Sequence, residues 1–106
     1  MLKRKTKHII QLIRKNVGMI DSKAEIILYG SRARGDERPD SDWDILVLTD
    51  YSVDLQKERI FRDNLYDLEI ETGEPFSVFV YSKEDWTNKQ RISPFYSNVT
   101  QEGVRI

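Results

Sequence analysis

Residues 26–50 read IILYGSRARGDERPDSDWDILVLTD and hold two short apolar runs with a polar connection between them. The first run, Ile26–Tyr29, ends at a Gly-Ser pair, and the second, Ile45–Leu48, comes after Asp42 and Asp44. Short, Ile-rich runs bounded by turn residues are typical of buried strands. The stretch therefore predicts two strands, and the connection between them carries the residues that bear chemistry.

The Gly-Ser pair predicts a turn that binds phosphate. A strand, a glycine turn and a new helix leave backbone N–H groups unpaired at the helix start, and these donors and the helix dipole favour an anion. Gly30 lets the backbone approach a phosphate closely, and Ser31 adds a hydroxyl donor. Arg32 and Arg34 add guanidinium groups able to hold phosphate oxygens. A Gly-Ser pair alone is a weak signal, so the prediction also depends on the acidic residues later in the connection.

The two aspartates predict a metal site. In a strand over Asp42–Leu48 the side chains alternate between faces, so Asp42 and Asp44 share a face. They lie about 7 Å apart at Cα, so that their oxygens can converge on one cation. Their repulsion is costly unless metal or protons neutralise it, and oxygen ligands near a phosphate site fit Mg²⁺ or Mn²⁺. A solvated loop is our interpretation of the other acidic residues of the connection, which are Asp36, Glu37 and Asp40.

Length and composition predict one small domain over residues 1–106. The net charge of −1 argues neither for nor against nucleic acid, which is therefore not indicated as a partner. The absence of cysteine excludes disulfides and thiolate metal sites, and the single histidine excludes a His-rich zinc site. No apolar run approaches the ~20 residues that span a bilayer, and no signal-peptide core comes after the basic N-terminus. We expect a cytoplasmic protein without a membrane partner.

The remaining chain predicts helices around a third strand. Apolar residues at 3.6-residue spacing predict an amphipathic helix over residues 3–20 and another over 51–72. Asp54 is a candidate N-cap of the second helix, and Gly73 is a natural stop. Alternation predicts a strand over Phe76–Ser82. These elements predict an α/β (α+β) fold with a small mixed sheet of three or more strands flanked by helices.

The end of the chain is predicted less specifically. Ser82 is a candidate N-cap of a short helix, and Pro94 breaks that helix. Residues 94–106 predict a short helix or turn and then a tail. The sequence leaves open whether this tail completes the domain or docks onto another subunit. Self-association also stays open because of three aromatic residues in this region, which are Trp86, Phe95 and Tyr96.

The spacing of the motif resembles that of a known family. Gly30-Ser31, ten further residues and Asp42-Trp43-Asp44 are similar to the GSx10DxD signature of the DNA polymerase beta-like nucleotidyltransferase superfamily. The form GSRARG…SDWD looks like the minimal nucleotidyltransferase domains of bacteria and archaea, of the MNT/MntA-like antitoxin type. The motif covers about a quarter of the chain, and the order of helices and strands extends the resemblance to most of it. The resemblance implies a polymerase beta-like nucleotidyltransferase fold.

The resemblance also implies a divalent-metal mechanism of nucleotidyl transfer. Gly30 and Ser31 would hold the phosphates of a nucleoside triphosphate, and Asp42 and Asp44 would bind two divalent metals, Mg²⁺ or Mn²⁺. An acceptor hydroxyl would attack the α-phosphate, and pyrophosphate would leave. By the same resemblance, the nucleotide expected is ATP and the group transferred is AMP, with Arg32 or Arg34 steadying the triphosphate.

One position departs from the pattern that the resemblance implies. Catalytic members of the superfamily usually carry a third carboxylate on the next core strand, and here Ser77 takes the expected place. Serine supplies neither a carboxylate base nor an anionic metal ligand at neutral pH. Three glutamates are candidate substitutes that the sequence alone does not place in the site, and they are Glu69, Glu71 and Glu74.

The motif and its departure lead to two functional hypotheses. In the first, the chain is an enzyme that transfers a nucleoside monophosphate to a hydroxyl acceptor. Domains of the resembling bacterial group often work beside a HEPN-type protein as the antitoxin half of a toxin–antitoxin pair, so the acceptor would lie on such a partner. In the second, the chain is a catalytically weak or inactive nucleotide- and metal-binding antitoxin module that acts by contact. The intact GSx10DxD favours the first hypothesis, and Ser77 favours the second.

Overall fold

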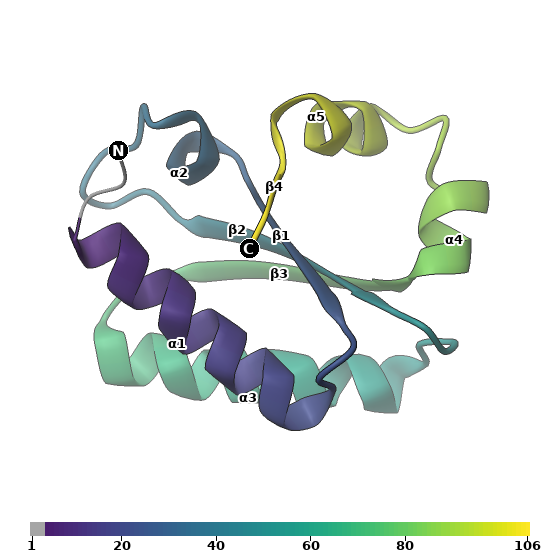
Figure 1. Ribbon diagram of the computed structural model, residues 1–106, viewed down its shortest axis with the longest axis horizontal. Helices are drawn as coiled ribbons and strands as arrows, with labels where there is room; N and C mark the ends of the chain where they lie inside the picture. The colour runs from purple at the N-terminus through teal and green to yellow at the C-terminus, as the bar shows by residue number, and fades with distance from the viewer. Residues whose placement is uncertain (1–3) are drawn as a thin grey trace.

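The computed structural model describes residues 4–106 as a four-stranded sheet with helices on both faces (Figure 1). The strands lie in the order β3-β2-β1-β4. Strand β1 (Glu25–Tyr29) is antiparallel to β2 (Trp43–Thr49) and to β4 (Val104–Arg105), whereas β2 is parallel to β3 (Phe76–Ser82). The sheet is therefore mixed, and the predicted α/β fold is confirmed.

Helices α1 (Arg4–Ile20) and α3 (Leu55–Thr72) cover one face of the sheet (Figure 1). They pack on alternate residues of β2, where Trp43, Ile45 and Val47 are fully buried. The apolar stripe predicted for the second helix points into this core, which buries the side chains of Phe61, Leu65 and Leu68. The burial of such large side chains is the main stabilising term of a domain of this size.

Helices α4 (Lys83–Asn88) and α5 (Pro94–Glu102) lie on the opposite face. Leu46 and Leu48 of β2 point toward them, so the predicted alternation of the strand is confirmed. Val99 of α5 is 3% exposed in this second core. The C-terminal segment thus packs on the sheet as part of the domain.

The ends of the elements are set by local capping chemistry. The helix predicted over 51–72 begins only at Leu55, because the Asp54 carboxylate accepts a hydrogen bond from the Lys57 N–H at 2.8 Å. Ser82 caps α4 as predicted, accepting from the Asp85 N–H at 3.0 Å. Residue 3, where the first helix was predicted to begin, lies outside the described residues.

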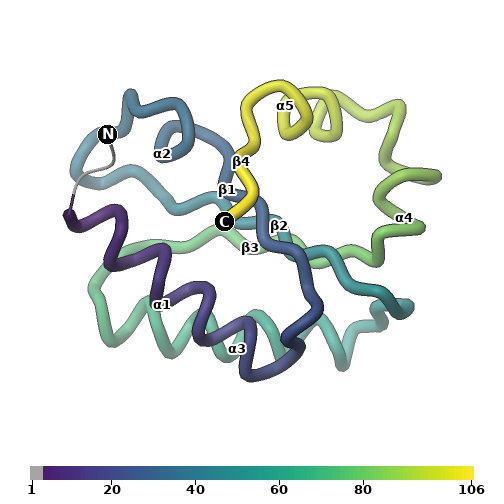
Figure 2. The backbone as a smooth tube through the Cα atoms, in the orientation of Figure 1, coloured from purple at the N-terminus to yellow at the C-terminus, as the bar shows by residue number. Residues whose placement is uncertain are grey.

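Strand β4 is the element that the sequence did not predict. It has only two residues, and it pairs Val104 with Leu28 and Arg105 with Ile27 of β1. The Ile106 N–H extends this pairing by donating to the Ile26 carbonyl at 2.9 Å. Figure 2 shows the end of the backbone lying beside β1.

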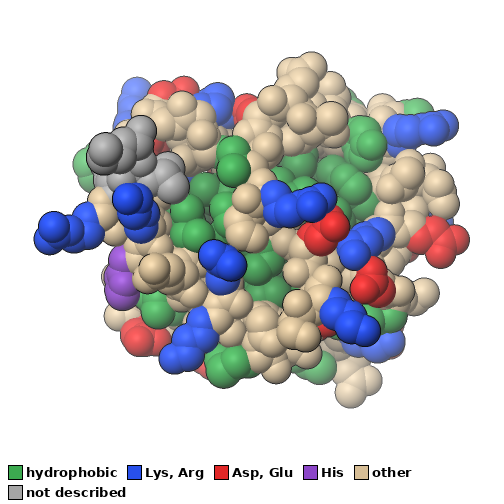
Figure 3. All heavy atoms as spheres, viewed as in Figure 1, with side chains coloured by type: hydrophobic (Ala, Val, Ile, Leu, Met, Phe, Trp, Pro, Cys, Tyr) green, Lys and Arg blue, Asp and Glu red, His purple; other side chains and the backbone are tan. Residues whose placement is uncertain are grey.

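The surface of the described chain is mixed in charge. On the face seen in Figure 3, Lys and Arg side chains are spread among Asp and Glu side chains. None of the helices between residues 4 and 106 is long and apolar enough to cross a membrane.

Candidate active site

The predicted phosphate turn lies at the end of β1, where Gly30 precedes the one-turn helix α2 (Ser31–Arg34). Gly30 has φ +75° and ψ −160°, a region of backbone conformation that is open almost only to glycine. A Cβ atom added to Gly30 would overlap the Oδ2 atom of Asp44. Glycine is therefore required here both by the turn and by the carboxylate packed against it.

Asp44 lies in the middle of the sheet, near the start of β2. Its register partners are Tyr29 on β1 and Ser77 on β3. Asp42 lies just before β2, where its side chain is exposed, whereas Asp44 is half-buried. The structure therefore brings together Gly30 and the carboxylate that the sequence assigned to metal binding.

The electrostatics of Asp44 favour a cation. Burial raises the pKa of Asp44 above its ordinary value, and the nearby charges of Asp42 and Glu102 raise it further, while Arg34 lowers it. A raised carboxyl pKa means that the ionised form is held at a cost, which a bound cation would relieve. The oxygen-only donors of Asp42 and Asp44 fit Mg²⁺ or Mn²⁺. Within residues 4–106, however, no group of three or more His, Cys, Asp and Glu side chains is arranged to hold a metal ion.

Glu102, at the end of α5, is a residue of the site that the sequence did not predict. Its Oε1 atom accepts a hydrogen bond from the Gly30 N–H at 3.0 Å. Its Oε2 atom accepts one from Arg34 Nη1 at 2.9 Å. Glu102 lies 72 residues beyond Gly30 in the chain, and no local pattern links the two, so only the fold could reveal the contact.

The two arginines of the turn lie in different environments. Arg34 is exposed and pairs with Glu102 and with Asp36. Arg32 is 7% exposed, and its guanidinium lies 4.6 Å from the centre of the Trp43 ring. Trp43 belongs to the core between the sheet and helices α1 and α3. The fold therefore leaves Arg34 beside the carboxylates and takes Arg32 away from them.

Arg32 is instead bonded to the loop that leads to the aspartates. Its Nη2 atom donates to the Ser41 carbonyl at 3.1 Å and more weakly to the Pro39 carbonyl at 3.4 Å. These bonds fix the chain immediately before Asp42. The phosphate role of Arg32 stays a prediction, and the structure shows its guanidinium buried and bonded to the loop that precedes Asp42.

Residues 9–98 match the family model of the nucleotidyltransferase domain. This chain belongs to the nucleotidyltransferase domain family. The match confirms the family and the enzyme class that the motif predicted. A search of curated proteins found no match.

Solved structures agree with this nucleotidyltransferase in fold. A toxin–antitoxin crystal structure with AMP-PNP is 21% identical, with a TM-score of 0.62 over 94% of this chain and 70% of that chain. A mutant of the MntA–HpeT toxin–antitoxin is 18% identical, with a TM-score of 0.60 over the same shares. A Sulfolobus solfataricus protein named as a candidate nucleotidyltransferase is 20% identical, with a TM-score of 0.53 over 94% of this chain and 80% of that one.

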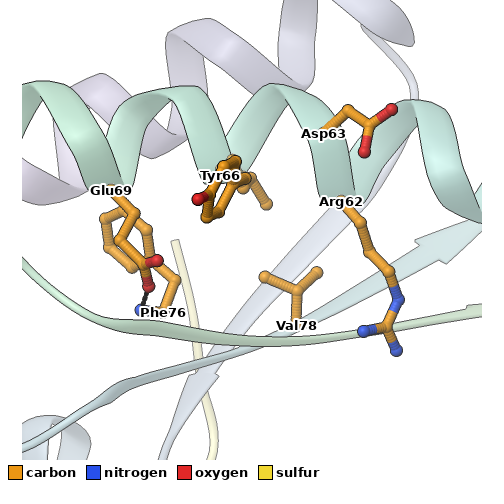
Figure 4. Close-up of a pocket in the computed structure, with 7 residues that line it drawn as sticks. Arg62, Asp63, Tyr66, Glu69, Phe76 and Val78 are labelled. Atoms are coloured by element: carbon orange, nitrogen blue, oxygen red, sulfur yellow. Dashed lines mark hydrogen bonds between the residues drawn. The ribbon is translucent and has the colours of Figure 1, made fainter.

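The three glutamates considered as substitutes for a third carboxylate lie elsewhere in the nucleotidyltransferase. Glu69 accepts a hydrogen bond from the Phe76 N–H at 2.9 Å, between α3 and β3 (Figure 4). Glu74 is buried and pairs with Lys5, and its Oε2 atom lies 3.8 Å from Arg32 Nη2. Glu71 is exposed on α3, which covers the opposite face of the sheet from Asp44. The structure therefore does not support any of these three glutamates as the third carboxylate of the site.

A groove between α3 and β3, of about 270 Å³, is also separate from the candidate site. Its lining includes Tyr66, Phe76 and Val78 (Figure 4). Phe76 and Val78 lie on the face of the sheet that α1 and α3 cover, whereas Asp44 points to the opposite face. The groove therefore does not supply the nucleotide site.

Proposed function

We propose that this nucleotidyltransferase transfers AMP from ATP to a hydroxyl group of a partner protein, with a divalent metal. The observation that carries the proposal is the contact between Gly30 and the Asp44 carboxylate. This contact supports the proposal because it puts the predicted phosphate turn next to one of the two predicted metal ligands. A triphosphate held at the turn would lie beside the cation that neutralises it.

In this proposal the residues divide the work between phosphate and metal. The turn at Gly30 and Ser31 receives the triphosphate, with Ser31 and the guanidinium of Arg34 as donors, while the Gly30 N–H keeps its bond to Glu102. Asp42 and Asp44 hold Mg²⁺ or Mn²⁺, and a metal bound there would stabilise the negative charge of the reacting phosphates. The acceptor hydroxyl loses its proton to water and its oxygen forms a bond to the α-phosphorus. The bond from that phosphorus to the bridging oxygen breaks, and pyrophosphate leaves.

The nucleotide and the partner are proposed on separate grounds. ATP is supported by the fold similarity to a toxin–antitoxin structure that contains AMP-PNP. A protein partner is supported by the two toxin–antitoxin structures of similar fold. The motif's resemblance suggests a HEPN-type protein, carrying the acceptor hydroxyl, and a cytoplasmic location for the pair.

The proposal is tested with the purified chain, Mg²⁺, labelled ATP and two acceptor sources, which are a cell lysate and any small helical protein encoded by the neighbouring gene. Label should appear on a protein with the parent chain and disappear with the Asp42→Asn/Asp44→Asn double variant. Asp40→Asn is the matched control, because Asp40 is an exposed acidic residue of the same loop.

Two results would contradict the proposal. Label transfer by the double variant would exclude Asp42 and Asp44 as the metal site. Binding of ATP and Mg²⁺ without transfer to any acceptor would support the nucleotide-binding antitoxin module that Ser77 favours.

A further inference from the structure

The conformation of the Gly30 turn is held from two sides. Asp44 fills the space on one side, where any other residue would place its Cβ atom. On the other side the Gly30 N–H donates to Glu102 at 3.0 Å. A backbone conformation this rare costs about 1–3 kcal/mol and persists only where its surroundings enforce it. The hydrogen bond to Glu102 is one of the two contacts that hold this conformation.

The position of Glu102 is fixed by the chain immediately after it. A Cβ atom added to Gly103 would overlap the Val99 carbonyl oxygen and approach a methyl group of Ile27. Glycine thus lets the end of α5 lie directly against β1. The pairing of β4 with β1 then anchors the chain end. The Glu102 carboxylate is therefore presented to the turn by packing rather than by a flexible tail.

Both oxygens of Glu102 are engaged by groups of the phosphate turn. Oε1 accepts from the Gly30 N–H, and Oε2 accepts from Arg34 at 2.9 Å. One carboxylate thus fixes the backbone of the turn and the direction of its exposed guanidinium. Hydrogen bonds to an ionised group are about twice as strong as neutral ones, so the link is well suited to setting geometry.

We propose that Glu102 is a positioning residue, which holds the Gly30 turn and Arg34 in the arrangement that receives the triphosphate. This inference rests on the proposed function, because it concerns the same phosphate site. It assigns to the C-terminal segment a part in nucleotide binding. Glu102 acts through Gly30 and Arg34 and does not take over the role of the carboxylate that is absent at Ser77, since its oxygens face donors of the turn.

Two variants separate the two contacts. Glu102→Gln keeps an oxygen that can accept from the Gly30 N–H but loses the charge that holds Arg34. Glu102→Ala loses both contacts. We expect ATP binding in Mg²⁺ to weaken about tenfold in the Ala variant and about threefold in the Gln variant. KM should rise more than kcat falls, because the turn binds ground-state phosphates.

The amide resonance of Gly30, measured by NMR without nucleotide, gives a readout that is independent of activity. It should move strongly in Glu102→Ala and less in Glu102→Gln. Gln101→Ala is the control, because Gln101 is the exposed neighbour on α5, and it should change neither the resonance nor ATP binding. Thermal unfolding of each variant shows whether a loss of binding reflects loss of the fold.

Three outcomes would overturn the inference. Unchanged ATP binding and an unchanged Gly30 resonance in Glu102→Ala would show that the contact has no role. Tighter ATP binding in that variant would show that Glu102 competes with phosphate for the two donors. Weaker binding that only tracks a loss of folded protein would show a merely structural role. If the parent chain binds no ATP, the proposed function fails, whereas the Gly30 resonance still tests the contact itself.

Discussion

Gly30 and Asp44 lie so close together that a single added carbon at position 30 would overlap the carboxylate. Gly30 directly follows β1 and Asp44 belongs to β2, where it is the register partner of the residue before Gly30. The distance between phosphate turn and metal ligand is thus set by backbone pairing in the centre of the sheet. Nucleotide binding and stability should both respond to changes in this contact and in its neighbours.

Gly30→Ala should abolish ATP binding and lower the free energy of unfolding by about 3 kcal/mol. The new side chain would have to adopt a positive φ and displace Asp44. Gly73→Ala is the matched control, because Gly73 has nearly the same φ, +74°, but nothing within 4 Å of an added Cβ. It should cost only about 1 kcal/mol and leave ATP binding intact. If Gly30→Ala and Gly73→Ala had the same effect on denaturant unfolding and on ATP titration, the contact between Gly30 and Asp44 would have no role.

Asp44→Asn should raise the melting temperature at pH 7 in the presence of EDTA. Burial, with the charges of Asp42 and Glu102, raises the pKa of Asp44 in the folded state above its unfolded value. The folded state then binds the proton more tightly, so ionised Asp44 destabilises the fold above the folded pKa and this penalty fades as the pH falls. The difference between parent and variant should therefore shrink toward acid pH, and a variant that melts below the parent at pH 7 would contradict this account.

Ser77→Asp should accelerate nucleotidyl transfer by at least ~100-fold, the lower end of the range of general-base catalysis. The register places position 77 beside Asp44, where a carboxylate could take the proton of the acceptor hydroxyl. Ser77→Asn, which has a similar shape and no charge, should give no acceleration. Initial rates with saturating ATP measure the effect, and a rate that stays at the parent value would show that proton removal does not limit the reaction.

The two arginines of the turn should separate stability from binding. Arg32→Lys should lower the free energy of unfolding by about 2 kcal/mol, because lysine loses the bonds to the Pro39–Ser41 loop and the stacking on Trp43. Arg34→Lys should change stability by less than about 0.5 kcal/mol, since Arg34 is exposed, and should weaken ATP binding about tenfold. Both variants are compared by denaturant unfolding and ATP titration. If Arg32→Lys weakened ATP binding and Arg34→Lys lowered stability, the phosphate role would belong to Arg32.

Local patterns were enough to predict most of the fold. The alternation over Asp42–Leu48 placed Trp43 and Asp44 on opposite faces, because a strand has no other way to arrange neighbouring side chains. The structure confirms this division. Capping by Asp54 was predicted for the same reason, since an N-cap needs only its own side chain and the next turn of backbone.

Contacts between distant parts of the chain were beyond those patterns. The two-residue strand β4 has too few residues for any periodicity, and its pairing with β1 is set by packing of α5. The role of Glu102 depends on that pairing, so it was missed as well. Arg32 and Arg34 have the same chemistry in the sequence, and only the curl of a four-residue helix sends one into the core and the other to the site.

The central claim is that the Gly30 turn and the Asp42/Asp44 pair form one centre for nucleotidyl transfer. The most direct test compares ATP labelled at the α-phosphate with ATP labelled at the γ-phosphate, each incubated with the chain, Mg²⁺ and the acceptor protein. We predict that α-label becomes attached to the acceptor protein and that γ-label is released in pyrophosphate. Attachment of γ-label, or attachment of α-label by the Asp42→Asn/Asp44→Asn variant, would contradict the account.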